Sequence, residues 1–160
     1  MTVRKSFHRF KKDMTGTKYL NFIADIFGVP AEVRGERIKK YADIFELTDD
    51  LPQSISSYSH GMKQKLVLIS ALCHEPKLLI LDEPFVGLDP IASYKLKEVM
   101  REMCDKGSAI FFSTHVLEVA EKLCDKVGII KQGKLVAEGN MKDVIGDKSL
   151  EKVFLELENV

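Results

Sequence analysis

Two adjacent carboxylates follow a short apolar run in this 160-residue sequence. Leu78–Leu81 precede Asp82 and Glu83, and Pro76 and Pro84 bound the segment. Such a run is typical of a strand buried on both faces of a parallel sheet, and open parallel sheets carry their chemistry beyond the carboxyl ends of the strands. There Asp82 could hold a Mg²⁺ that bridges nucleotide phosphates, and Glu83 could orient or deprotonate an attacking water. A helix-capping Asp beside a solvated Glu is the alternative for this segment taken alone.

An upstream segment has the features of an anion site. Ser59 is suited to cap a helix that continues through residues 65–72, and Gly61 lets the backbone approach a ligand closely. The first N–H groups of such a helix and its positive dipole end favour a phosphate as the ligand.

Two further positions lie downstream of the carboxylates. Asp89 and Pro90 suit the N-cap and the first position of a helix. Residues 109–113 then predict a second buried strand, which leads to His115.

At these residues the chain resembles the ATP-binding subunits of ABC transporters, from about Met14 to the C-terminus. The family's Ser-Gly-Gly-Gln signature corresponds to Ser59-His60-Gly61-Met62, its Walker B strand to Leu78–Asp82, its catalytic glutamate to Glu83, its D-loop to Gly87–Asp89 and its switch histidine to His115. The tail at 149–157 looks most like the ATPases of exporter-type systems.

The resemblance implies an α/β fold: an incomplete P-loop NTPase core with a parallel sheet, plus an α-helical subdomain. Asp82 would reach Mg²⁺ through water, and Glu83 would act as general base or position the water. His115 would donate to the γ-phosphate, with a helix-capping histidine as the alternative.

The remaining implied contacts lie across a subunit boundary. The signature residues Ser59, His60, Gly61 and Met62 would bind ATP held by a second subunit, and Asp89 would lie at the dimer seam. His60 and Met62 depart from the family's glycine and glutamine, and the His60 side chain would either point away or add a donor.

The sequence contains no Gly-x-x-x-x-Gly-Lys-Ser/Thr phosphate loop. Gly16-Thr17-Lys18 lacks the spacing to replace it, and no family glutamine loop precedes Met14, since the first glutamine is Gln53. We therefore expect a truncated or mis-started subunit that binds Mg-ATP weakly or not at all, and whether the chain alone is an enzyme stays open.

Two functions follow from these features. The first is part of an ATP-binding subunit that, when complete, hydrolyses ATP to drive transport across a membrane. The second is a non-hydrolysing partner that supplies its signature motif to an intact ATPase. A DNA-repair or ribosome-associated ABC protein is disfavoured, because the 24 basic and 24 acidic residues cancel and no long coiled-coil insertion is visible.

The expected partners are a transmembrane permease subunit and a second ATP-binding subunit, with no nucleic acid. The expected location is cytoplasmic, at the inner face of a membrane through partner subunits. No apolar run approaches the roughly 20 residues that a membrane helix requires. Three cysteines without a Cys-x-x-Cys pattern indicate neither a disulfide framework nor a zinc site, and Cys73 reads as a buried thiol beside a surface turn.

The predicted organisation is a basic tail at 1–12, a helical subdomain at 13–72 and an α/β portion at 73–160. In the helical part, the stripe Tyr19, Phe22, Ile23, Ile26 and Phe27 is expected to face the core, and a second helix to span 32–45.

Downstream, helices are expected at 91–105, 116–124 and 150–157, a short helix capped by Asn140, and a hairpin of strands 127–131 and 134–138 around Gln132-Gly133. In the family's strand order, the missing phosphate-loop strand would leave the strand at 109–112 with an unpaired edge. Self-association of the chain is therefore expected.

Overall fold

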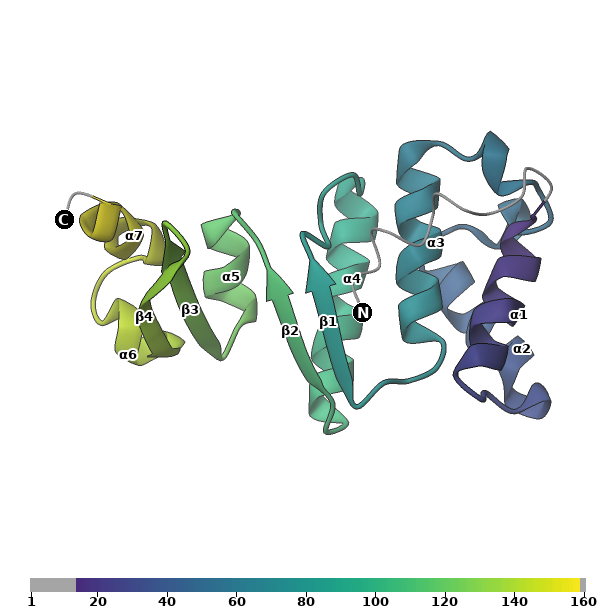
Figure 1. Ribbon diagram of the computed structural model, residues 1–160, viewed down its shortest axis with the longest axis horizontal. Helices are drawn as coiled ribbons and strands as arrows, with labels where there is room; N and C mark the ends of the chain where they lie inside the picture. Colours follow the sequence, from purple (N-terminus) through teal and green to yellow (C-terminus); the bar gives the residue numbers. More distant parts are fainter. Residues whose placement is uncertain (1–13, 159–160) are drawn as a thin grey trace. The chain divides into compact units, whose positions relative to one another are not determined.

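The computed structural model describes residues 14–158, which form two compact units (Figure 1). The first unit ends at Ser113 and carries α1 to α4 with β1 and β2. The second begins at Thr114 and carries α5 to α7 with β3 and β4. The basic tail predicted at 1–12 lies outside the described residues.

The helical part of the first unit contains α1 (Gly16–Ile26), α2 (Ala31–Ile44), α3 (His60–Leu72) and the short 3₁₀ segments η2 (Thr48–Asp50) and η3 (Ile55–Ser57). Thr15 begins α1, because its Oγ1 accepts the Lys18 N–H at 3.2 Å. Both α1 and α2 pack against α3 and hold this helix in place.

The prediction that an apolar stripe on α1 faces the core is wrong for most of its residues. Phe22, Ile26 and Phe27 are each about half exposed, and Ile23 is half-buried. The helix instead buries Gly16, Tyr19, Leu20 and Ala24. Both sets recur at helical spacing, and periodicity alone does not say which set faces the protein.

The α/β part of the first unit contains β1 (Leu78–Asp82), α4 (Pro90–Asp105) and β2 (Ala109–Ser113). The two strands are parallel, with Leu78 opposite Ala109 and Asp82 opposite Ser113. The helix α4 packs against β2 and lies along the strand pair in Figure 1. The carboxyl ends of both strands therefore meet at Asp82 and Ser113.

The sequence predicts that both faces of this strand pair are buried. Among residues 14–113 this prediction is wrong. Leu79 and Leu81 are buried, whereas Leu78 is 58% exposed, Ile80 52% and Phe111 68%. An apolar run can be buried on two faces only if a layer covers each of them. The residues of this unit cover one face.

The second unit contains α5 (Leu117–Leu123), β3 (Lys126–Lys131), β4 (Lys134–Asn140), α6 (Met141–Ile145) and α7 (Leu150–Glu158). The predicted antiparallel hairpin is confirmed, and Gln132 and Gly133 turn with φ of 51° and 77°. Ala120, Ile129, Met141 and Leu150 form its core. Within residues 14–158, no helix is both long enough and apolar enough to span a bilayer.

Asn140 occupies the predicted N-cap position of α6 without capping through its side chain. Its Nδ2 instead donates to Asp143 Oδ2 at 2.7 Å. Asn140 is therefore the predicted N-cap residue by position, while its side-chain amide bonds to the carboxylate in the first turn.

Candidate functional site

The two carboxylates lie where β1 ends, and Ser113 at the end of β2 contacts the Asp82 carboxylate and the Glu83 backbone. Ser113 Oγ donates to Asp82 Oδ1 at 2.6 Å. The Glu83 N–H reaches both Ser113 Oγ and Ser113 O, each at 3.2 Å. Because hydrogen bonds to charged acceptors are short and strong, Ser113 fixes the orientation of the Asp82 carboxylate.

Glu83 has an unusual backbone conformation. Its φ is 47°, in the left-handed region that glycine and asparagine favour over glutamate. Such conformations cost about 1–3 kcal/mol and persist only where surrounding contacts enforce them. The two hydrogen bonds from the Glu83 N–H to Ser113 are contacts of this kind.

Ser113 is a site residue that sequence reasoning missed. It was assigned only to a strand, since a serine at a strand end has no distinctive pattern. The parallel register that pairs Asp82 with Ser113 was the missing information. The signal in the sequence would have been that each of the two predicted strands ends in a polar residue, Asp82 and Ser113, which a parallel register brings side by side.

Replacing Ser113 with alanine is expected to weaken the orientation of Asp82. In a chain carrying a phosphate loop ahead of Met14, Ser113→Ala should raise the Mg²⁺ concentration needed for half-maximal ATP hydrolysis by about tenfold or more, because one hydrogen bond to a charged group contributes roughly 1.5–3 kcal/mol. A titration of turnover against Mg²⁺ measures this.

Ser108 offers a matched control at the other end of the same strands. Its Oγ donates to the Pro76 carbonyl at 3.0 Å, so Ser108→Ala removes this hydrogen bond, whereas Ser113→Ala removes the bonds to Asp82 and to the Glu83 N–H. An equal Mg²⁺ shift in both variants would show that Ser113 stabilises the fold without orienting Asp82.

The helix α3 begins as the sequence predicted. Ser59 Oγ accepts the Met62 N–H at 3.2 Å, which confirms Ser59 as the N-cap. Tyr58, which precedes Ser59, is anchored because its buried hydroxyl donates to the Asp50 carbonyl at 2.7 Å. Burial raises the pKa of Tyr58 to about 12. Ser59 and His60 are both exposed at the start of the helix, where unpaired N–H groups and the dipole favour an anion.

The turn after Glu83 packs against this helix start. A Cβ on Gly61 would lie 3.2 Å from the Gly87 carbonyl, and a Cβ on Gly87 would lie 3.0 Å from His60 Cδ2. Gly87 also has a φ of 83°. The imidazole that replaces the family glycine therefore lies against Gly87.

Asp89 caps α4 as predicted, since its Oδ1 accepts the Ala92 N–H at 2.8 Å. Pro90 takes the first helical position, where a missing N–H costs nothing. The turn thus links Glu83 to α4 through a short segment with both ends fixed.

His115 belongs to the second unit, and its side chain is exposed. The N-cap of α5 is Val116, without a side-chain capping bond, and the Val116 N–H bonds to Thr114 Oγ1 at 3.1 Å. Val116, and not His115, therefore occupies the N-cap position of α5. Its role towards a phosphate stays a prediction.

A magnesium ion fits Asp82 as one of several ligands. Within residues 14–158, no group of three His, Cys, Asp or Glu side chains could hold a metal ion. Mg²⁺ commonly keeps several waters and binds one or two carboxylates together with substrate phosphates. The exposed Asp82 carboxylate suits that arrangement.

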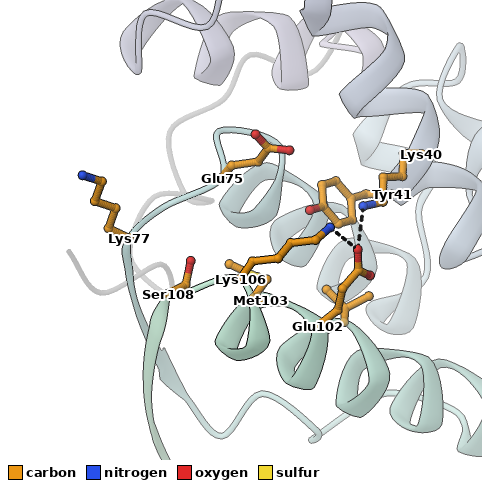
Figure 2. A pocket seen from close by; sticks show the side chains of 9 residues that line it. Lys40, Tyr41, Glu75, Lys77, Glu102, Met103, Lys106 and Ser108 are labelled. Atoms are coloured by element: carbon orange, nitrogen blue, oxygen red, sulfur yellow. Dashed lines mark hydrogen bonds and ion pairs between the residues drawn. The ribbon is translucent and has the colours of Figure 1, made fainter.

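A cavity of about 280 Å³ lies at the opposite end of the strand pair (Figure 2). Lys77 and Ser108, which precede β1 and β2, belong to its lining. Glu102 there accepts from Lys40 at 3.5 Å and from Lys106 at 2.5 Å. The cavity is therefore separate from the carboxyl ends of the strands.

Cys73 is a buried thiol, as predicted, and burial raises its pKa to about 11. The neighbouring His74 ring stacks on Phe27 with centroids 3.8 Å apart. Burial lowers the pKa of His74, opposed by its hydrogen bond to the Ser70 carbonyl. These residues serve packing between α1 and the end of α3.

Comparison with known proteins places this arrangement in a family. Residues 5–121 match the family model described as "AAA domain, putative AbiEii toxin, Type IV TA system". The chain is 36% identical over 138 residues to the uncharacterized ABC transporter ATP-binding protein all4389 of Nostoc sp. strain PCC 7120, covering 85% of this chain. It is 39% identical over 131 residues to the uncharacterized ABC transporter ATP-binding protein YxlF of Bacillus subtilis strain 168, covering 82% of this chain.

A solved structure, titled as an ATP-binding subunit of an ABC transporter, superposes with a TM-score of 0.89 at 34% identity. It covers 94% of this chain, and this chain spans 65% of it. The chain spans 41% of all4389 and 44% of YxlF. The expected α/β fold, part of a P-loop NTPase core, is confirmed. The chain belongs to the family of the AAA-domain model, and the relatives that it matches are ATP-binding proteins of ABC transporters.

Proposed function

We propose that this chain supplies the signature and Walker B part of an ATP-binding subunit, which in complete form hydrolyses ATP to drive transport across a membrane. The carboxyl edge shared by Asp82, Glu83 and Ser113 supports this most strongly. At this edge Asp82, which would bind the metal, precedes Glu83, which would act as general base, and phosphoryl transfer requires both roles.

Each carboxylate has a separate role in this proposal. Asp82 would help to hold Mg²⁺, which when bound neutralises phosphate charge. Glu83 would accept a proton from the attacking water or hold that water in line. Ser113 would keep Asp82 oriented through its 2.6 Å hydrogen bond.

The start of α3 would bind the phosphates of ATP held by a second ATP-binding subunit. The helix N-terminus capped by Ser59 supplies N–H donors, and His60, Gly61 and Met62 form its first turn. Asp89 would lie near this contact, and His115 would donate to the γ-phosphate. A transmembrane permease subunit would be the further partner and would hold the chain at the cytoplasmic face of the membrane.

The unmodified 160-residue chain is expected to bind Mg-ATP with a Kd above roughly 100 µM. Each charge-assisted contact contributes roughly 1.5–3 kcal/mol, and this sequence contains no phosphate loop to supply several of them. Calorimetry measures the affinity.

A matched fusion tests the proposed function itself. A phosphate loop of the family pattern, with its strand and helix ahead of Met14, should bind Mg-ATP tightly and hydrolyse it. Micromolar binding by the unmodified chain would contradict the affinity prediction, and a folded fusion without ATP hydrolysis would contradict the proposed function.

A non-hydrolysing partner is the second candidate. The exposed start of α3, in a sequence without a phosphate loop, supports it. Only this candidate predicts that the unmodified chain associates with an intact ATP-binding subunit when ATP is added. Analytical ultracentrifugation of the mixture, with and without Mg-ATP, separates the two functions.

A further inference from the structure

An ion pair joins α3 to the turn that follows Glu83. Lys65 Nζ lies 2.9 Å from Asp89 Oδ2. The Lys65 side chain is only 15% exposed, while that of Asp89 is 49% exposed. A lysine whose side chain is mostly buried has fewer other places for its ammonium than a surface lysine, so it depends more on the carboxylate beside it.

Asp89 uses its two carboxylate oxygens for two different segments. Oδ1 accepts the Ala92 N–H at the start of α4, and Oδ2 pairs with Lys65 on α3. The Ala92 hydrogen bond, followed by the Lys65 contact, lowers the pKa of Asp89. The carboxylate therefore stays ionised at neutral pH and ties α3 to the first turn of α4.

The His60–Gly87 contact lies on the same two segments and is independent of the ion pair. Gly61 and Gly87 permit a backbone approach that a Cβ at either position would crowd. Two hydrogen bonds then continue from the turn towards Glu83, from the Val86 N–H to the Glu83 carbonyl at 3.2 Å and from the Leu88 N–H to the Phe85 carbonyl at 3.3 Å.

We propose that Lys65 is a positioning residue that makes the start of α3 and the turn 87–89 move together. Separating these segments would leave the ammonium at the end of the mostly buried Lys65 side chain without its carboxylate, so a displacement of one segment is passed to the other. Under the proposed function, on which this consequence rests, a phosphate bound at the start of α3 would thereby shift Glu83.

Hydrogen exchange of the full 160-residue chain tests the mechanical link without nucleotide. Lys65→Met keeps the aliphatic stem and removes the charge, and Asp89→Asn keeps an oxygen for the Ala92 N–H. Each variant should speed amide exchange in the segment that does not carry the substitution, 87–93 or 60–66, by about tenfold. Lys65→Arg should restore most of the protection.

Two comparisons separate coupling from a general loss of stability. Lys95→Met removes an exposed ion pair with Glu98 on α4 and should leave both segments unchanged. Exchange in β1 should stay within about twofold in all variants. The proposal is overturned if Lys65→Met leaves 87–93 unchanged, or if it speeds exchange in β1 and both segments equally.

The fusion with a phosphate loop then gives a separate functional readout. Lys65→Met should lower kcat by about tenfold and leave the KM for ATP within about twofold, because the change acts on the position of Glu83. If exchange is coupled but the fusion does not hydrolyse ATP, the proposed function fails and the link stands. If the fusion hydrolyses ATP without coupled exchange, only the link fails.

Discussion

Glu83→Gln, in a chain with a family phosphate loop ahead of Met14, is expected to lower ATP turnover by about 10²–10⁴-fold while ATP still binds. A positioned general base contributes a factor of that size, and glutamine cannot accept the proton of the attacking water at neutral pH. Glutamine has the same length and shape as glutamate, so the site geometry is retained. Steady-state turnover and equilibrium ATP binding, measured on the same preparation, check both parts.

Glu98→Gln provides the control for this substitution. Glu98 is an exposed glutamate within α4 that pairs with Lys95 at 3.1 Å. Its variant should turn over ATP at the parent rate. Equal turnover in the Glu83→Gln fusion would remove Glu83 from the proposed chemistry.

The 160-residue chain is expected to self-associate as its concentration rises. Leu78, Ile80 and Phe111 expose apolar surface on one face of a two-stranded sheet. Within residues 14–158, β2 pairs with a strand along only one edge. An exposed apolar face beside an open strand edge favours addition of a second copy, since burial contributes about 25 cal/mol per Å².

Phe111→Thr tests which surface carries the association. Losing roughly 60 Å² of apolar burial should weaken association about tenfold, as measured by light scattering over a concentration series. Ile130 on β3 is 67% exposed, nearly as much as Phe111, so Ile130→Thr is the matched control and should leave association unchanged. A strictly monomeric parent chain with cooperative unfolding would contradict the prediction.

Local signals predicted where most elements begin and end. Ser59 and Asp89 accept the capping hydrogen bonds expected of them, and Gln132 and Gly133 form the expected turn. In each case the deciding interaction spans only a few residues of sequence. Capping and turn chemistry is therefore readable without the rest of the fold.

Burial and the supporting contacts of the site could not be predicted in the same way. An apolar run such as β1 shows that a strand can be buried, but the layer that covers it comes from elsewhere. Ser113 and Lys65 act through residues distant in sequence, Asp82 and Asp89, and neither belongs to a recognisable spacing. Only the strand register and the packing of α3 bring these partners together.

Position 83 has two requirements that no single residue type meets, one from its left-handed backbone and one from the proposed chemistry. The conformation would be relaxed by glycine, whereas the proposed chemistry needs a carboxylate. A library selected only for thermal stability would therefore favour glycine at this position and discard the base, while selection for turnover would retain the strained glutamate. Stability and activity are thus in direct competition at residue 83, and the contacts from Ser113 decide how much strain the fold can tolerate there.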